Sequence, residues 1–407
     1  MKVVQISVSP TGGAGIAAYR LHTSLNNSGV CDSVFVCSDA CIYNNQPDVI
    51  QVKPTEPNFK SRFIKKIKLL FGTTIDFYTW ITQTKGSYEI VTWPETNYFV
   101  ELEKVVLDAD IIHLHWVSGF INYPTFFKKL KHKKIIWTLH DMNPFMGIFH
   151  YKGDQIINSA FNKLDQKALQ IKSATLKNTN LQIIVLSNWM QKEAIMNPVF
   201  NKFNYTNIPN GVDCNIFKPL DKNVARKKIN IPENEYVILV VAEKVDNYRK
   251  GIDILVEALS SIKSKSIVRV LSVGKGELQL TAKNVNYNAL GPIYNEKELA
   301  NIYAAANLFV IASREDNLPN VMLEAFACGI PVLGFPVGGV KQYVIPFVTG
   351  LLADDISAVA LSKSLEQFLV NPDEFSSMKI SEYAQKKFSS NLLTDNHLRF
   401  YKSLLNG

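Results

Sequence analysis

Short apolar segments alternate with amphipathic segments along almost the whole chain, and this rhythm constrains the fold more than any other feature. The first half contains apolar runs at Val3–Val8, Ser33–Cys37, Asp110–Leu114, Ile135–Leu139 and Ile183–Leu186. These runs have the length of buried strands, and parallel strands need helical crossovers between them. The sequence therefore predicts an α/β protein with parallel sheets that helices cover on both faces.

The rhythm stops near the middle of the chain and then restarts. The stretch Asn207–Asp213 is dense in turn formers and separates the two halves. Further strands are expected at Tyr236–Ala242, Val268–Val273, Val285–Leu290, Leu308–Ile311 and Pro331–Gly334. Because 407 residues exceed the usual size of one domain, we predict two doubly wound, Rossmann-like domains facing a central cleft, at 1–206 and 207–388. A C-terminal helix within 389–407 is expected to pack back toward the first domain.

Composition excludes several classes of protein. With 47% hydrophobic and 20% charged residues, the chain suits a folded globular protein and not a disordered or fibrous one. Its longest apolar runs fall far below the roughly 18–20 residues that cross a bilayer. We interpret the first eight residues as a buried strand and not as a signal peptide. Five cysteines, an odd number without Cys-x-x-Cys spacing, favour a reducing, cytoplasmic setting.

The charge balance is basic, and its distribution is uneven. A net charge of +8 permits binding to phosphorylated substrates, anionic membrane or nucleic acid without choosing among them; we expect no nucleic-acid partner. Six of the basic residues fall between Lys53 and Phe71, against the single acid Glu56, and apolar residues recur there at helical spacing. This basic amphipathic helix is either a solvated surface helix or a contact for anionic lipid.

A glycine-rich loop follows the first expected strand. Gly12 and Gly13 open the turn into a helix, where free amides attract a phosphate or another anion. The residues Gly13–Ala18 also satisfy G-x-G-x-x-A, with Asp32 and Asp39 about 20 residues on, so an NAD-dependent oxidoreductase is an alternative. A tight turn without a ligand is a third interpretation.

Histidines end two successive strands. His113 and His115 alternate onto one face, and His115 lies nearer the ligand end of its strand. His140 and Asp141 end the next strand, where Asp141 could fix an imidazole tautomer or bind a sugar hydroxyl. A metal site is not expected, because no third ligand follows at a suitable spacing.

The second half carries cations and carboxylates around two strand-to-helix loops. Lys244 and Lys250 flank the loop after Tyr236–Ala242, next to a helix start, which is a favourable site for a diphosphate. Asp316 and Glu324 bracket a later loop. Glu324 lies among apolar residues and would be costly to bury without a partner, for which a ribose diol is suited.

These residues together resemble a known family. The pair Asp316 and Glu324, the tail Glu-Ala-x-x-x-Gly-x-Pro-Val, Lys244 with Lys250-Gly251, Asn210–Asp213 and the Gly-Gly loop look like retaining glycosyltransferases with the GT-B fold, specifically glycosyltransferase family 4. The segment Trp137–Met142 with Pro144-Phe145 looks like the branch that acts in bacterial polysaccharide assembly.

The resemblance implies roles for matching residues. Lys244 and Lys250 would bind the donor diphosphate, Glu324 the ribose, and Asp316 with Asn317, Leu318, Pro319 and Asn320 the donor sugar. Gly12 and Gly13 would line the cleft near the phosphate, and His115 and His140 would face the reacting sugar or the acceptor. Lys250, Asp316, His115 and His140 are thus the candidate catalytic residues.

Three departures bear on the donor. Asp316 replaces the usual glutamate, and Glu315 is adjacent as a substitute. Lys244 stands where arginine is common, so bidentate phosphate contact is lost. The cysteine cluster that often follows the His-Asp-Met segment is replaced by Phe149–Lys152.

The resemblance implies transfer of a hexose-type sugar from a nucleotide diphosphate donor to a saccharide acceptor, possibly lipid-linked, with retention and without a cofactor or metal. A sugar-nucleotide epimerase of similar two-domain shape and a non-catalytic membrane or scaffold protein are further alternatives. We expect a cytoplasmic enzyme that associates with the inner membrane face through the basic helix at Lys53–Phe71.

Overall fold

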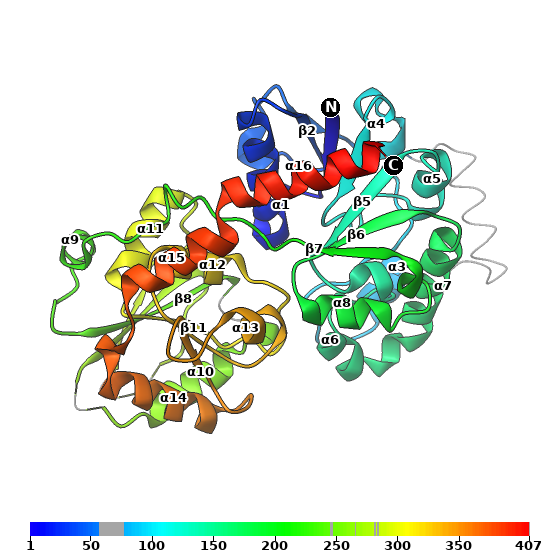
Figure 1. The fold of residues 1–407 in the computed structure, drawn as a ribbon. Helices are drawn as coiled ribbons and strands as arrows, with labels where there is room; N and C mark the ends of the chain where they lie inside the picture. The colour runs from blue at the N-terminus through cyan, green and yellow to red at the C-terminus, as the bar shows by residue number, and fades with distance from the viewer. Residues whose placement is uncertain (57–76, 245–246, 265, 281, 283–284, 407) are drawn as a thin grey trace. The chain divides into compact units, whose positions relative to one another are not determined.

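The computed structural model describes residues 1–56, 77–244, 247–264, 266–280, 282 and 285–406. The chain forms two compact units (Figure 1). The first comprises residues 1–186, 190–208 and 396–407, and the second comprises 187–189 and 209–395. Most of the basic helix expected at Lys53–Phe71 lies outside the described residues.

Before residue 209, seven strands alternate with helices. The strands are β1 (Lys2–Ile6), β2 (Asp32–Cys37), β3 (Val49–Gln51), β4 (Ile111–Leu114), β5 (Lys134–Leu139), β6 (Leu181–Val185) and β7 (Asn204–Asn207). The α-helices are α1 (Gly12–Asn27), α3 (Phe77–Gln83), α4 (Lys104–Leu107), α5 (Tyr123–Lys129), α6 (Lys152–Ile157), α7 (Asn162–Leu176) and α8 (Asn188–Ile195).

After residue 209, six further strands form the second sheet. They are β8 (Tyr236–Lys244), β9 (Val268–Lys275), β10 (Val285–Ala289), β11 (Leu308–Ile311), β12 (Val332–Gly334) and β13 (Gly350–Leu352). The α-helices are α9 (Lys222–Lys228), α10 (Ile252–Ser261), α11 (Glu296–Ala305), α12 (Asn320–Ala327), α13 (Gly338–Tyr343), α14 (Ala358–Val370), α15 (Ser377–Phe388) and α16 (Ser390–Asn406). From Asn396 onward, α16 belongs to the first unit.

Both sheets are parallel and doubly wound. The first has the strand order β3-β2-β1-β4-β5-β6-β7, and the second has β10-β9-β8-β11-β12-β13. The chain therefore reverses direction across the sheet between β1 and β4 in the first unit and between β8 and β11 in the second. Ligands of such sheets bind beyond the carboxyl ends of the strands at this switch point. The predicted α/β class with two Rossmann-like sheets is confirmed.

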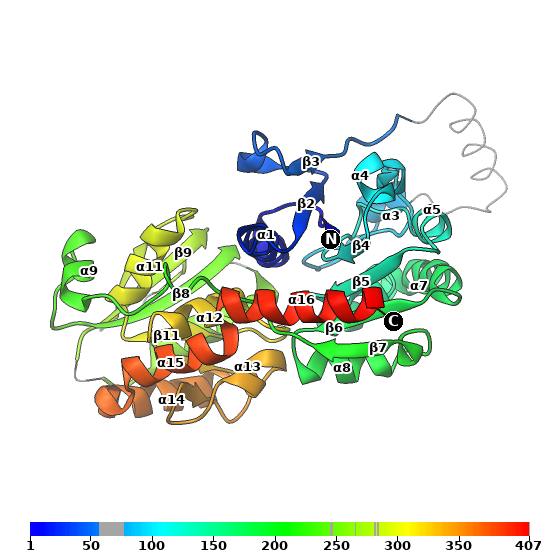
Figure 2. The same ribbon diagram turned by 45° about the horizontal axis from the view of Figure 1, so that its top comes forward.

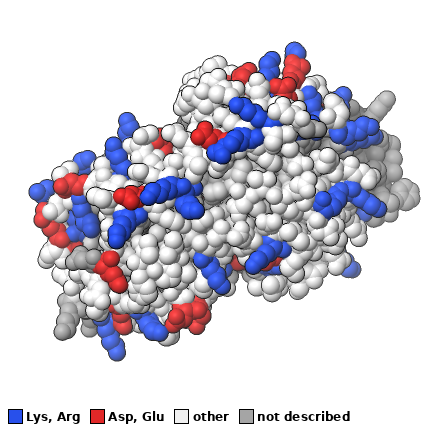
Figure 3. All heavy atoms as spheres, in the orientation of Figure 1, with Lys and Arg blue, Asp and Glu red and all other residues white. Residues whose placement is uncertain are grey.

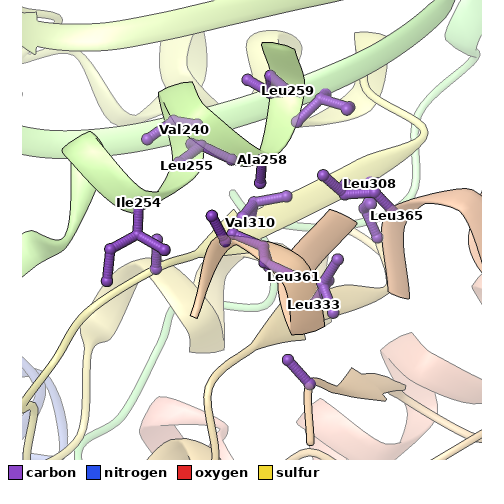
Figure 4. Close-up of a cluster of buried hydrophobic side chains, with 14 of the residues drawn as sticks. Val240, Ile254, Leu255, Ala258, Leu259, Leu308, Val310, Leu333, Leu361 and Leu365 are labelled. Atoms are coloured by element: carbon purple, nitrogen blue, oxygen red, sulfur yellow. The ribbon is translucent and has the colours of Figure 1, made fainter. Parts of the chain in front are cut away.

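Helices cover both faces of each sheet (Figures 1 and 2). In the second unit, Leu255 of α10 and Leu361 of α14 pack with Val240, Val310 and other strand residues in one buried apolar cluster (Figure 4). On the opposite face, the ring of Tyr303 from α11 packs edge-on against Phe309 of β11. Burial on both faces explains why these strands are nearly continuous apolar runs.

Several element boundaries differ from the expectation. The first strand ends at Ile6 and not at Val8, because Val8 N instead bonds Trp116 O in the loop after β4. The short strands β3, β7 and β13 were not predicted, since each has only three or four residues and little apolar alternation. They are added at the sides of the two sheets and do not alter the switch points.

Basic and acidic side chains are interspersed on the face of the molecule in Figure 3, without one large single-sign patch there. Within the described part of the chain, every helix is too short or too polar to cross a bilayer.

Candidate active site

The switch point of the second unit carries an ion-paired cluster. Lys250 precedes α10, in the connection that follows β8, and Asp316 lies in the loop after β11. The Lys250 Nζ donates to Asp316 Oδ2 at 2.6 Å, and the Arg249 guanidinium lies 3.5 Å from the same oxygen. The sequence predicts Lys250 and Asp316 as separate site residues, and the sheet topology brings them into contact.

Asp316 is a buried anion held by several partners. It is 6% exposed and also accepts a hydrogen bond from Ser313 Oγ. Burial alone would raise its pKa, but Lys250 and Arg249 outweigh this and leave the pKa below its ordinary value. The carboxylate is therefore ionised at neutral pH, and it orients Lys250, whose side chain keeps 24% of its surface exposed.

Two glycines allow the loops of this cluster to approach each other. Gly251, with φ of 64°, lies so close to the Ala312 carbonyl that an added Cβ would be 1.9 Å from its oxygen. Gly338 has a φ of 44°, and a Cβ added there would lie 1.7 Å from the main-chain carbonyl oxygen of Asp316. No side chain fits either position, so the loops after β8, β11 and β12 depend on these glycines.

The neighbouring helix α12 presents a buried carboxylate and a buried amide. Glu324 is 4% exposed and accepts a hydrogen bond from the Tyr303 hydroxyl at 3.1 Å. Asn320, the first residue of α12, accepts from Asn210 Nδ2 through its side-chain oxygen at 2.8 Å. The prediction that Glu324 needs a defined partner thus has one answer within the protein, Tyr303, which sequence reasoning missed.

The other predicted residues of this loop lie beside the cluster. Asn317, Leu318 and Pro319 are all buried, and Asn317 O accepts from Gly339 N at 2.6 Å. Glu315, considered as a substitute for Asp316, is only partly buried, and its carbonyl accepts from Arg249. Asp316 is the carboxylate whose contact with Lys250 the structure shows.

Lys244 differs from its expected position. It was placed in the loop after a strand ending at Ala242, whereas β8 continues to Lys244 and shifts register between Val241 and Lys244. The shift accommodates one extra residue at the end of β8, a feature that apolar periodicity does not reveal. Lys244 is exposed and pairs in register with Lys275 of β9.

The first unit has its own polar cluster at its switch point. Gly12 and Gly13 begin α1, after β1, and Gly12 adopts a φ of 72°. His115 follows β4, and His140 follows β5. Their rings are joined, because His115 Nδ1 lies 3.1 Å from His140 Nε2. The structure thus brings together the two histidines that the sequence placed on neighbouring strands.

Burial keeps these histidines neutral. His115 is 4% exposed and His140 is partly buried. Loss of solvation lowers the pKa of His115 well below 6.5 and the pKa of His140 to about 4. His113, fully buried beside them, is shifted in the same direction for the same reason. At neutral pH these histidines are linked by hydrogen bonds and carry no positive charge.

Asp141 has partners other than His140. Its Oδ2 accepts from Trp116 Nε1 and lies 2.6 Å from His150 Nδ1, while its Oδ1 accepts from Asn143 N. These contacts lower the pKa of Asp141 against the effect of burial. The contacts of Asp141 thus stabilise the loop after β5.

A buried lysine supports the same loop and was missed from the sequence. Lys172 of α7 is 1% exposed, and its Nζ donates to Asn143 O, Asn143 Oδ1, Met146 O and Gly147 O at 2.6–3.2 Å. Burial lowers its pKa to about 7. The only signal was a lysine on the apolar side of a helical pattern, which does not identify partners 25 to 29 residues away.

Among the residues that the structure describes, three or more histidines, cysteines or carboxylates do not gather in a metal-binding arrangement.

Comparison with known proteins identifies one part of the chain. Residues 221–387 match the family model of glycosyl transferases group 1. This segment contains Lys250, Asp316 and Glu324, so the ion-paired cluster lies inside the matched domain.

Relatives with described activities match part of the chain. The chain is 29% identical to D-inositol 3-phosphate glycosyltransferase of Segniliparus rotundus over 213 residues, which cover 49% of this chain and 47% of the relative. The enzyme of the same name from Thermobispora bispora is 24% identical over 66% of this chain and 64% of its own. A GDP-mannose-dependent monoacylated alpha-(1-6)-phosphatidylinositol monomannoside mannosyltransferase of Corynebacterium glutamicum is 31% identical, over 41% and 48%. The chain thus spans about half to just under two thirds of these relatives.

Solved structures resemble the chain over its full length. Sucrose-phosphate synthase from Thermosynechococcus elongatus superposes with a TM-score of 0.69 at 22% identity, covering 100% of this chain and 99% of the other. HepE of Anabaena, solved in complex with UDP-glucose, gives a TM-score of 0.69 at 15% identity, over 99% and 100%. These likenesses establish the GT-B fold.

Proposed function

We propose that the protein is a retaining glycosyltransferase that moves a hexose-type sugar from a nucleotide diphosphate donor to a saccharide hydroxyl. The observation that carries this proposal is the cluster of Arg249, Lys250 and Asp316 at the switch point of the second unit, within the segment that matches glycosyl transferases group 1. A cation held in place at the carboxyl end of parallel strands is suited to a diphosphate.

The donor would bind through the second unit. Lys250 and Lys244 would contact the diphosphate, Glu324 the ribose hydroxyls, and Asp316 with the segment 317–320 the sugar. Because Asp316 already holds Lys250 at 2.6 Å, the cation is oriented before the donor arrives. Such preorganised charge does not need to rearrange during the reaction, which is the condition for effective electrostatic stabilisation.

Transfer would proceed on one face of the sugar. The bond between the anomeric carbon and the diphosphate oxygen breaks, and the acceptor oxygen bonds to the same face of that carbon. The leaving diphosphate takes the proton of the acceptor hydroxyl, and Lys250 stabilises its growing charge. No protein nucleophile and no metal is needed in this scheme.

His115 and His140 would serve the acceptor side. Both follow strands at the carboxyl edge of the first sheet, and both are neutral at pH 7. A neutral imidazole can hydrogen-bond a sugar hydroxyl without attracting phosphate, which suits a saccharide acceptor. Both nitrogens of His115 already contact Gln5 and His140, so His140 would meet the hydroxyl and His115 would orient His140.

The acceptor is proposed to be a saccharide, possibly lipid-linked, of polysaccharide assembly. The enzyme would then work in the cytoplasm and meet the acceptor at the inner membrane face. The basic run at Lys53–Phe71 would bind anionic lipid, since each juxtamembrane cation contributes about 1 kcal/mol. Vesicle co-sedimentation should show binding that rises with anionic lipid, falls with salt and weakens when Lys65, Lys66 and Lys68 become glutamate; equal partitioning would refute it.

A panel of donors tests the activity. The protein is incubated with UDP- and GDP-sugars, with and without saccharide acceptors, and free nucleotide diphosphate and product anomer are measured. Acceptor-dependent release of UDP or GDP with a retained anomer is expected. Conversion of the donor without acceptor would indicate an epimerase, and binding of NAD alone would indicate an oxidoreductase built on Gly13–Ala18. Loss of turnover in EDTA that Mg²⁺ or Mn²⁺ restores would refute metal independence.

A further inference from the structure

A row of polar side chains lies buried on one face of the first sheet. Gln5 of β1 pairs in register with His113 of β4, and His113 pairs with Ile136 of β5, so Gln5, His113, His115 and Thr138 share that face. All four are at most 4% exposed. Tyr401 of α16, which is 0% exposed, contacts this row from outside the sheet.

These side chains form one continuous hydrogen-bonded chain that ends at His140. His113 Nε2 lies 2.7 Å from Thr138 Oγ1, and His113 Nδ1 lies 2.7 Å from Tyr401 Oη. Gln5 Nε2 lies 3.4 Å from the same hydroxyl oxygen of Tyr401. On the other side, Gln5 Oε1 lies 2.7 Å from His115 Nε2, and His115 Nδ1 lies 3.1 Å from His140 Nε2. Each internal member contributes one donor and one acceptor, so fixing one proton fixes the direction of all the bonds.

Tyr401 is the member that sets this direction. Its hydroxyl meets Gln5 Nε2, which is a donor, and His113 Nδ1, which can accept. Within the described part of the chain, that imidazole nitrogen is the acceptor within reach of the hydroxyl proton. A buried hydroxyl proton is almost always hydrogen-bonded, so Tyr401 donates to His113 Nδ1. His113 must then carry its proton on Nε2 and donate it to Thr138.

The orientation of Gln5 fixes the bonds toward His140. Gln5 presents Nε2 to Tyr401 and therefore Oε1 to His115. The 2.7 Å separation from His115 Nε2 suits an N–H donor to an oxygen better than a contact between two nitrogens. His115 thus carries its proton on Nε2 and accepts through Nδ1, and the donor in that bond is His140 Nε2.

We propose that Tyr401 is a positioning residue that fixes the tautomer of His140, with the proton on Nε2 and the lone pair on Nδ1. The proposal rests on the proposed function only in the use made of that lone pair. With this tautomer His140 Nδ1 can only accept, so any group that bonds to it must be a hydrogen-bond donor, such as a sugar hydroxyl, and not a phosphate or carboxylate oxygen. The C-terminal helix would thereby set the chemistry at the end of β5.

The tautomers can be measured without any substrate. Long-range ¹H–¹⁵N spectra of the ¹⁵N-labelled full chain report which imidazole nitrogens are protonated, and seven histidines can be assigned with single His→Gln variants. We expect His113, His115 and His140 all to be protonated on Nε2 at pH 7.5. A proton on Nδ1 of His140 in the unmodified protein would overturn the proposal, whatever the enzyme activity.

A conservative variant tests the role of Tyr401. Tyr401→Phe keeps the ring but removes the hydroxyl, and it should convert His115 and His140 to mixtures of tautomers. Tyr205→Phe is the control, because the Tyr205 hydroxyl donates to Phe200 O at 2.8 Å and is not a member of the hydrogen-bonded row. If the proposed transfer occurs, Tyr401→Phe should lower kcat about 3–10-fold, the scale of one neutral hydrogen bond, without changing nucleotide Kd. Unchanged spectra of His115 and His140 in Tyr401→Phe would refute the proposal; if that variant does not fold, the spectrum of the unmodified protein decides alone.

Discussion

The two switch points are built on the same topology but from opposite chemistry. In the second unit, Lys250 and Arg249 face the ionised Asp316. In the first, His115 and His140 are neutral and linked by hydrogen bonds. One site is arranged to stabilise charge, and the other to orient neutral donors and acceptors. The proposed reaction, which releases a diphosphate and transfers a sugar to an acceptor hydroxyl, would use both kinds of environment.

The largest expected effect follows removal of the cation of the second unit. Lys250→Ala should lower the transfer rate about 10²–10³-fold, because it removes one preorganised donor from the leaving group. Initial rates at saturating donor measure this. Lys363→Ala is the control, since Lys363 pairs with Asp354 on the surface with 75% of its side chain exposed, and its rate should be unchanged. If Lys250→Ala transferred the sugar at the normal rate, Lys250 would have no part in the mechanism.

Replacing the buried carboxylate should weaken nucleotide binding less severely. Glu324→Gln keeps the shape but loses the charge, and a hydrogen bond to a charged group is worth about 1.5–3 kcal/mol. We therefore expect about 10–100-fold weaker binding of the nucleotide diphosphate by calorimetry. Tyr303→Phe removes the hydroxyl that donates to Glu324 and should bind the nucleotide nearly normally. Equal affinity of Glu324→Gln and the unmodified protein would exclude the ribose role.

A variant of the first unit should separate transfer from donor binding. His140→Ala is expected to lower kcat up to about tenfold, the scale of one neutral hydrogen bond. The nucleotide Kd should stay constant, because the proposed donor site lies in the other unit. His132→Ala changes an exposed histidine outside the cluster and should leave both quantities unaltered. A loss of nucleotide affinity in His140→Ala would break the division between the two sites.

Acidification should weaken the first unit through its neutral histidines. Their pKa values lie below the value of about 6.5 in the unfolded chain, so at mildly acidic pH the unfolded state binds more protons than the folded state. Stability that is full above pH 6.5 is therefore lost as the pH falls, by up to about 1.4 kcal/mol per pH unit for His140, whose pKa is about 4. His113 and His115 act in the same direction. The lowered pKa of Asp316 keeps that carboxylate ionised over most of this range.

Calorimetric melting from pH 7.5 to 5 measures this difference. The unmodified protein should lose about 2–4 °C in Tm per kcal/mol, and His140→Gln should lose less on acidification. The exposed His132→Gln control should follow the unmodified protein. A Tm that stays constant across this range would contradict the neutral state assigned to the histidine cluster.

Much of the fold was predictable because it depends on local patterns. Apolar runs bounded by turns located the long strands, and glycines marked the loops at their ends. What could not be predicted depends on pairing between distant segments. The contact of Lys250 with Asp316 requires β8 and β11 to be neighbours, and the contact of Tyr401 with His113 joins residues 288 positions apart. The extension of β8 to Lys244 likewise depends on a register shift against β9.

The most direct test of the account is nucleotide binding to the full chain by isothermal titration calorimetry. UDP, GDP and NAD are titrated into the unmodified protein, Lys250→Ala and Lys363→Ala in the presence of EDTA. We expect UDP or GDP to bind the unmodified protein and Lys363→Ala, and to bind Lys250→Ala much more weakly. NAD should not bind. Binding of NAD alone, or equal UDP and GDP affinities for all three proteins, would contradict the claim that the cluster at the β8–β11 switch point holds the diphosphate of a sugar donor.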